Sequence, residues 1–345
     1  MQRWITGFAV TTLMFVSAVS AQAESSSGPY KVTKTAKVGG AGGFDYVYAD
    51  AAGRKLYVAR TGPTPRINVF NLDTLEPAGE IPNVGAHGAV VSTKSNHGFA
   101  SSKPITMFDA KTLAPIKTIE VEGNPDGLLY DAVNDRVYVL SHRAPNATVI
   151  NAADGSIVGT IDLGGAPEQA VSDGKGHIYV DIEDKDNIAV VDAKTMAVTA
   201  HYDLTGKGGT CAGLAMDVKN RILFASCRNP QNMVILNADD GTIITTLPIG
   251  QGTDGAAFNP ATMEAFSSQG DGTLTVIKEN SPTSFSVEQT VQTMTSAKTL
   301  TLDSKSNQIL LIAAQFTPPP TPPPAGRRSR GEMVPDSFSI LVVGK

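Results

Sequence analysis

The chain has 345 residues, and its 33 glycines and 21 prolines suit many short strands joined by tight turns rather than long helices. Its net charge of −5 is spread along the chain with both signs mixed, so no basic stripe exists to neutralise phosphates. We therefore expect no nucleic-acid partner. After the first residues, no segment reaches the roughly 18 apolar residues that a membrane span needs.

The N-terminal residues 1–23 have the pattern of a secretory signal peptide. Arg3 gives a positive start, residues 4–19 are mostly apolar, and Ala21–Ala23 offers small residues for cleavage. We expect a mature chain over residues 24–345 that is periplasmic or secreted.

One sequence pattern then recurs seven times, about every 40–44 residues. Each copy has a small or charged start, an apolar run, a polar turn and a second apolar run. The second runs centre on Tyr57, Phe99, Tyr138, Tyr179, Phe224, Phe266 and Leu310. Such a repeat is typical of a β-propeller with one blade per repeat, so we predict an all-β, single-domain, seven-bladed β-propeller.

Within each repeat we expect four strands, and the third repeat shows them over residues 127–130, 136–140, 148–151 and 157–162. The seventh repeat ends after Ser337–Val343, one strand short. Tyr30–Val38 is a spare alternating segment, and we predict that it closes the last blade and removes an open edge. Residues 317–335 form a Pro/Arg-rich segment within blade seven that favours an extended loop.

Three second strands carry a shared motif, in Tyr57-Val58-Ala59-Arg60, Tyr138-Val139-Leu140-Ser141 and Tyr179-Val180-Asp181-Ile182. With it the chain resembles the YVTN, or YncE-like, family of bacterial seven-bladed propellers, although the final Asn of the family motif is missing in all three copies. The family is more distantly similar to propeller lactonases, streptogramin lyase-type enzymes and cytochrome-associated propellers. The motif reports how the second strand packs, and a fold by itself transfers no activity.

The first residues of the innermost strands of a propeller surround one mouth of its central channel. We predict that this mouth is ringed by Asp45, His87, Asp126, Glu168, Ala212, Asp254 and Lys298. The loops after the second strands open on the same face and add Arg60, Lys103, His142, Arg143, Glu183, Asp184 and Arg228.

This set of side chains permits three kinds of chemistry. Carboxylates can bind a divalent metal ion, and the candidate ligands are Asp45, Asp126, Glu168 and Asp254. Clustered carboxyls raise one another's pKa, and the candidate catalytic acids and bases are His87, His142, Asp126 and Glu168. The same groups can instead pair with neighbouring cations or bind a ligand without reaction.

We interpret the chain as a monomeric binding or scaffold module that recognises a small polar ligand or a protein partner at the channel mouth. The alternative is a metal-assisted hydrolase or lyase at the acidic mouth, with His87 or His142 as acid or base. A third class, an electron-transfer accessory, would need a haem partner.

The two cysteines occupy one hairpin of the fifth repeat. Cys211 begins its first strand and Cys227 ends its second, so the two lie opposite each other at one end of the hairpin. We predict a disulfide, as an oxidising compartment favours. A free thiol or a metal-ligating pair are the alternatives.

Overall fold

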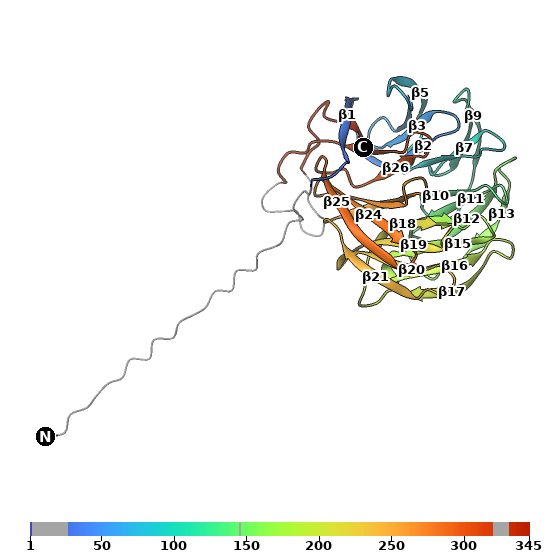
Figure 1. Ribbon diagram of the computed structural model, residues 1–345. Coiled ribbons are helices and arrows are strands. Elements are labelled where there is room, and N and C mark those ends of the chain that lie inside the picture. The colour runs from blue at the N-terminus through green and yellow to red at the C-terminus, as the bar shows by residue number, and fades with distance from the viewer. Residues whose placement is uncertain (2–26, 145, 320–330) are drawn as a thin grey trace.

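The computed structural model describes residue 1 and residues 27–144, 146–319 and 331–345. These residues form seven four-stranded antiparallel sheets in a ring, which confirms the predicted seven-bladed β-propeller (Figure 1). The helical content of the described residues is one 3₁₀ turn, Glu183–Lys185. None of their helices is long and apolar enough to cross a membrane. The predicted signal peptide, apart from its first residue, lies outside the described residues.

The blades follow the chain in order, each running from an innermost to an outermost strand. The first three consist of β2 (Phe44–Asp50), β3 (Lys55–Arg60), β4 (Arg66–Asn71), β5 (Pro77–Pro82); β6 (Ala89–Val91), β7 (His97–Ala100), β8 (Ile105–Asp109), β9 (Pro115–Ile119); β10 (Pro125–Asp131), β11 (Arg136–Ser141), β12 (Ala147–Asn151) and β13 (Ile157–Ile161). The next three consist of β14 (Pro167–Ser172), β15 (His177–Ile182), β16 (Asn187–Asp192), β17 (Ala197–Asp203); β18 (Cys211–Asp217), β19 (Ile222–Arg228), β20 (Gln231–Asn237), β21 (Ile243–Pro248); β22 (Thr253–Asn259), β23 (Glu264–Gln269), β24 (Thr273–Ser281) and β25 (Ser284–Gln292).

The seventh blade joins the two ends of the chain, as predicted. It consists of β26 (Leu300–Asp303), β27 (Gln308–Ala313), β28 (Ser339–Gly344) and β1 (Lys31–Lys37). The antiparallel pairing of β1 with β28 runs from Lys31 opposite Gly344 to Lys37 opposite Ser339. In Figure 1, β1 lies close to the C-terminus. The N-terminal strand therefore covers an edge that would otherwise be open.

Apolar side chains fill the spaces between neighbouring blades. Leu56 and Val58 of β3, for example, pack with Ile340 of β28 between blades one and seven. The motif tyrosines reach across such interfaces: the hydroxyl of Tyr179 donates to the carbonyl of Ala238 in the next blade at 2.9 Å. The repeated motif thus serves blade packing, which is why it recurs.

The Pro/Arg-rich segment 317–335 is described only at its two ends, since residues 320–330 lie outside the described part. Those ends are paired with each other: Thr317 N donates to Glu332 O at 2.8 Å, and Phe316 forms an antiparallel bridge with Met333. The segment therefore leaves and rejoins blade seven at one point, between β27 and β28.

Candidate functional site

The side chains at the channel mouth project from β-bulges. The register between the first and second strands shifts near the start of the innermost strand in blades one, three, four, five and six. A bulge leaves residues unpaired and turns their side chains out of the regular alternation. The residues within these shifts are Asp45, Tyr46, Asp126, Gly127, Glu168, Gln169, Ala212, Asp254 and Gly255.

Glycine after the first residue of the strand lets neighbouring innermost strands approach closely. A Cβ added at Gly213 would lie 2.6 Å from the carbonyl carbon of Gly255, and one at Gly127 would lie 2.8 Å from the backbone carbonyl oxygen of Glu168. Such contacts are too short for any larger residue without movement of the backbone. The innermost strands therefore form a tight collar, and the side chains that precede these glycines converge on its mouth.

One half of this collar carries an alternating series of acids and imidazoles. His87 Nδ1 lies 2.7 Å from Asp45 Oδ2 and 3.5 Å from Asp126 Oδ1. His142 Nε2 lies 3.5 Å from Asp126 Oδ2 and 3.5 Å from Glu168 Oε1. Each imidazole thus bridges two carboxyls that belong to different blades.

The other half alternates acids with a lysine and an arginine. Lys298 lies 3.4 Å from Asp45 and also pairs closely with Asp254. Arg228 pairs with Asp254 and lies 2.6 Å from Glu183 Oε1. The two halves meet at Glu183 and Glu168, whose carboxyls and the His142 ring offer ligand atoms all within 4.8 Å of one another.

These contacts close a circuit around the mouth, which we call the mouth ring. It consists of Asp45, His87, Asp126, His142, Glu168, Glu183, Arg228, Asp254 and Lys298. The imidazoles are its most accessible members, with side chains 42% exposed in His87 and 38% in His142, whereas Glu168 is 9% exposed. The ring therefore offers charge to solvent while its carboxyls are partly desolvated.

The surroundings shift the pKa of several ring members. The hydrogen bond to Asp45 raises the pKa of His87, and the hydrogen bond to Glu168 raises the pKa of His142 to about 9. Burial raises the pKa of Asp126, and burial raises the pKa of Glu168 to about 7 against the lowering effect of His142. The two imidazoles therefore hold their protons more tightly, and the Asp126 and Glu168 carboxyls release theirs less readily, than the same groups in water.

Two large side chains cross the channel beneath the mouth. The Tyr46 hydroxyl donates to Glu168 Oε2 at 3.3 Å, from blade one to blade four. Gln169 Oε1 accepts hydrogen bonds from the backbone N–H groups of Leu214 at 2.9 Å and Ala256 at 3.1 Å. A cavity of about 170 Å³ borders Tyr46, Glu168 and Gln169, which is less than an ordinary small-molecule site provides. A ligand would therefore meet the mouth ring from outside rather than enter the channel.

The structure does not bring Arg60 into the mouth ring. Its side chain is fully buried, donates to the carbonyls of Gly40 at 3.2 Å and Gly43 at 3.3 Å, and lies 3.9 Å above the centre of the Phe338 ring. Burial lowers its pKa to about 10. Arg60 thus fixes the segment between β1 and β2 and, contrary to our prediction, is not positioned to contact a ligand.

Two further predicted residues lie on exposed loops outside the circuit. Lys103 donates to the carbonyl of Gly123, and Arg143 is exposed beside His142. They flank the mouth ring without an ion pair to it in the contacts of the described residues. Ala212 is buried and apolar, and Asp184 lies half-exposed on the 3₁₀ turn outside the circuit.

The predicted metal ligands are regrouped by the structure. Asp45, Asp126, Glu168 and Asp254 do not form one set. Two separate triads have ligand atoms close enough to share an ion: Asp45, His87 and Asp126; and His142, Glu168 and Glu183. Asp254 joins neither, because Arg228 and Lys298 occupy its carboxylate.

Sequence reasoning undervalued three residues of the site. We expected Glu183 on a loop of the mouth face but did not expect it to contact Glu168. That contact depends on the 3₁₀ turn Glu183–Lys185, which places Glu183 beside Glu168. Tyr46 and Gln169 were missed. Their signal was available, because they stand where most repeats have Gly or another small residue after the first residue of the strand.

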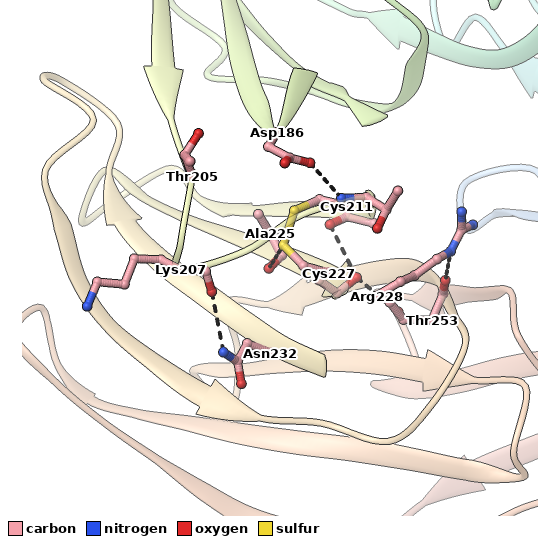
Figure 2. The surroundings of a disulfide bond; sticks show 12 residues. Asp186, Thr205, Lys207, Cys211, Ala225, Cys227, Arg228, Asn232 and Thr253 are labelled. Carbon is pink, nitrogen blue, oxygen red and sulfur yellow. Dashed lines mark hydrogen bonds between the residues drawn. A yellow bond between two sulfur atoms is a disulfide. The ribbon is translucent and has the colours of Figure 1, made fainter. Parts of the chain in front are cut away.

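The predicted disulfide is confirmed and lies next to the mouth ring. Cys211 and Cys227 are bonded, with an S–S distance of 1.98 Å (Figure 2). Cys227 directly precedes Arg228, whose backbone N–H donates to Gly209 O at 3.1 Å and whose Nε donates to Thr253 O at 2.9 Å. The cross-link and these hydrogen bonds hold the Arg228 backbone and guanidinium in place.

Comparisons with known proteins identify the fold. The structure of U3-55K matches with a TM-score of 0.72 and 12% identity, over 91% of this chain and 99% of that chain. A chain in the crystal structure of the mitotic checkpoint complex matches with a TM-score of 0.69 and 11% identity, over 86% of this chain and 95% of that chain. At such identities the likeness shows the propeller fold alone. No family model and no curated protein matches the chain.

Proposed function

We propose that this chain is a binding module whose mouth ring recognises a small polar ligand or a polar surface of a protein partner. The observation that carries the proposal is the closed circuit of charged side chains from all seven blades, placed on a partly exposed face above a channel that Tyr46 and Gln169 obstruct. Fixed charges on a shallow surface suit recognition of a hydrophilic group, since complementary charge contributes specificity.

The carboxyls of the mouth ring favour a function beyond simple ion pairing. If the ring served only to join blades, each acid would be satisfied by a base. Asp126 Oδ1 instead accepts no hydrogen bond from the described residues, and the carboxyl of Glu168 lies next to that of a second acid, Glu183. Partly desolvated polar atoms of this kind cost folding energy unless a ligand satisfies them.

A second candidate function is metal-assisted hydrolysis or elimination at the same mouth. The observation that favours it is the presence of imidazole and carboxyl groups in each triad, which could hold a metal ion that polarises a carbonyl. The obstructed channel and shallow mouth support it less, because hydrolytic chemistry gains from a site that excludes water.

We further propose that the chain belongs to the YVTN type of propeller and acts outside the cytoplasm, in the periplasm or after secretion. The Tyr-Val pairs in the second strands of three repeats support the first part. The Cys211–Cys227 disulfide supports the second, because structural disulfides persist in oxidising compartments.

The experiment that tests the binding proposal is a thermal-shift screen with polar metabolites, anions and cations. We expect at least one compound to raise the melting temperature of the wild type and to leave the double variant Asp126→Asn, Glu168→Gln unchanged, because binding to the folded state stabilises it. The control is Asn134→Ala, on the opposite face. If the shift persists in the double variant, the mouth ring is not the binding site.

A further inference from the structure

The mouth ring contains one break in its alternation of acid and base. Every other pair of neighbours joins a carboxyl to a basic side chain. Glu168 and Glu183 alone face each other as two acids, within the 4.8 Å cluster that they form with His142. Among the described ring contacts, the next basic group beyond Glu183 is Arg228, on its far side. A cation at this break would complete the alternation.

A buried carboxyl without a hydrogen-bond partner lies behind the break. Asp181 of β15 is fully buried, and neither of its oxygens accepts a hydrogen bond from the described residues. The β14–β15 register places it opposite the bulge that carries Glu168.

The other blades show that an acid at this position is not required for folding. The residues that correspond to Asp181 in the second strands of the other repeats are Ala59, Ser101, Leu140, Ser226, Ser268 and Ile312. A buried carboxyl without a partner costs stability. The one repeat that has an acid there is the repeat that also supplies Glu168 and Glu183.

We propose that His142, Glu168 and Glu183 bind one divalent transition-metal ion, with the unpartnered Asp181 carboxyl buried behind Glu168. One imidazole nitrogen and two carboxylates are ligands that ions such as Zn²⁺ and Mn²⁺ accept. Three protein ligands leave a coordination position open toward the mouth. This inference builds on the proposed function, because the open position would receive an oxygen of the polar ligand.

The second triad is the weaker candidate because its Asp45 carboxylate already has two basic partners. Asp45 lies 2.7 Å from His87 and 3.4 Å from Lys298, so a metal ion there would have to displace an existing cation. At the Glu168–Glu183 break the ion replaces only protons.

The test is calorimetric titration of the tag-free, chelator-stripped full chain with zinc chloride. We expect saturable binding of one equivalent, and a loss of affinity of at least about 10-fold in both Glu183→Gln and His142→Gln. The matched control is Asp184→Asn, which removes one negative charge from the same 3₁₀ turn, where the Asp184 side chain is 49% exposed. Asp184→Asn should keep the wild-type affinity within about 2-fold. A comparison variant, Asp45→Asn, disrupts the other triad and should lose less affinity than Glu183→Gln or His142→Gln.

Three outcomes would overturn the cation site: no saturable zinc heat in the wild type, unchanged zinc affinity in both Glu183→Gln and His142→Gln, or a greater loss in Asp45→Asn than in either. Circular dichroism establishes that each variant is folded. If Glu183→Gln does not fold, the exposed His142→Gln decides the question. A wild type that binds an organic ligand at the ring but no zinc rejects the cation site and leaves the proposed function standing.

Discussion

At the scale of single residues, the protein tolerates buried carboxyls that face one another. Glu279 in β24 is 3% exposed, and its carboxyl lies by that of Asp217 in β18 on the face opposite the mouth ring. Oε2 of Glu279 and Oδ2 of Asp217 each lack a hydrogen-bond partner among the described residues. Burial, together with the neighbouring Asp217 carboxyl, raises the pKa of Glu279 to about 7. The pair is best accommodated when a proton lies between the two oxygens.

This pair makes the stability of the protein depend on pH. The folded state binds the Glu279 proton more tightly than the unfolded chain, whose pKa is near the ordinary 4.5. The stability contributed by this proton is therefore present at low pH and is lost as the pH rises from about 4.5 through about 7. We expect Glu279→Gln to stabilise the protein at pH 8 by about 1–3 kcal/mol, because the amide donates to Asp217 without a proton.

The measurement is urea unfolding of wild type and Glu279→Gln at pH 5 and pH 8. At pH 5 the two proteins should be nearly equal, since Glu279 is then protonated. Equal stability at both values, or a destabilised variant at pH 8, would contradict the assignment. Asp271→Asn, on the mouth face, controls for the general effect of removing one acid.

The residue scale also shows what sequence reasoning could reach. The position of Asp45, Asp126 and Glu168 followed from the repeat, because the first residue of an innermost strand has one place in a propeller. The burial of the Arg60 side chain could not be predicted in this way. The direction of that side chain depends on the path of the segment before β2, and this path has no counterpart in the other repeats.

At the scale of elements, the Cys211–Cys227 bond ties β18 to β19 beside Arg228. Because the bond encloses a short loop, its loss should destabilise the protein by on the order of 3 kcal/mol at most on the chain-entropy account. Chemical unfolding of Cys211→Ser, Cys227→Ser measures this change. Thiol titration of the unreduced, denatured wild type should find no free thiol, and two free thiols would refute the bond in the isolated protein.

The pairing of β1 with β28 gives a second prediction at this scale. Removal of residues 24–38 exposes the edge of β28 and removes Tyr30, which is buried against Phe266. We expect this truncated chain to aggregate, since an open edge pairs with other chains. Light scattering compares it with a control that lacks only residues 24–27. A truncated chain that stays monodisperse with wild-type stability would show that β1 is dispensable for closure.

Sequence analysis predicted elements well and their local irregularities poorly. The four strands of the third repeat lie within one or two residues of their observed bounds. The bulges that carry Asp126 and Glu168 were not predicted, because one extra residue near the start of a short strand leaves the apolar pattern of the rest of the strand unchanged. The 3₁₀ turn that positions Glu183 has the same cause: a single charged turn carries no periodic signal.

At the scale of the whole molecule, the ring architecture explains why function gathers at one face. Seven repeats place equivalent residues around one axis, so modest departures in single repeats meet at the channel. Tyr46, Gln169 and Asp181 are such departures, and they come from blades one and four. The number of blades and their closure were predictable because repetition amplifies a weak pattern. The circuit of ion pairs was not, because it depends on side chains of different blades that no repeat relates.

The most direct test of the account is a crystal structure of the protein with the compound that gives the largest thermal shift. We predict that this compound contacts the mouth ring, with polar atoms within about 3.5 Å of Asp126, His142 or Glu168. A compound bound instead on the opposite face, near Leu129 and Phe258, or against the outer strands, would contradict the claim that the mouth ring is the recognition site.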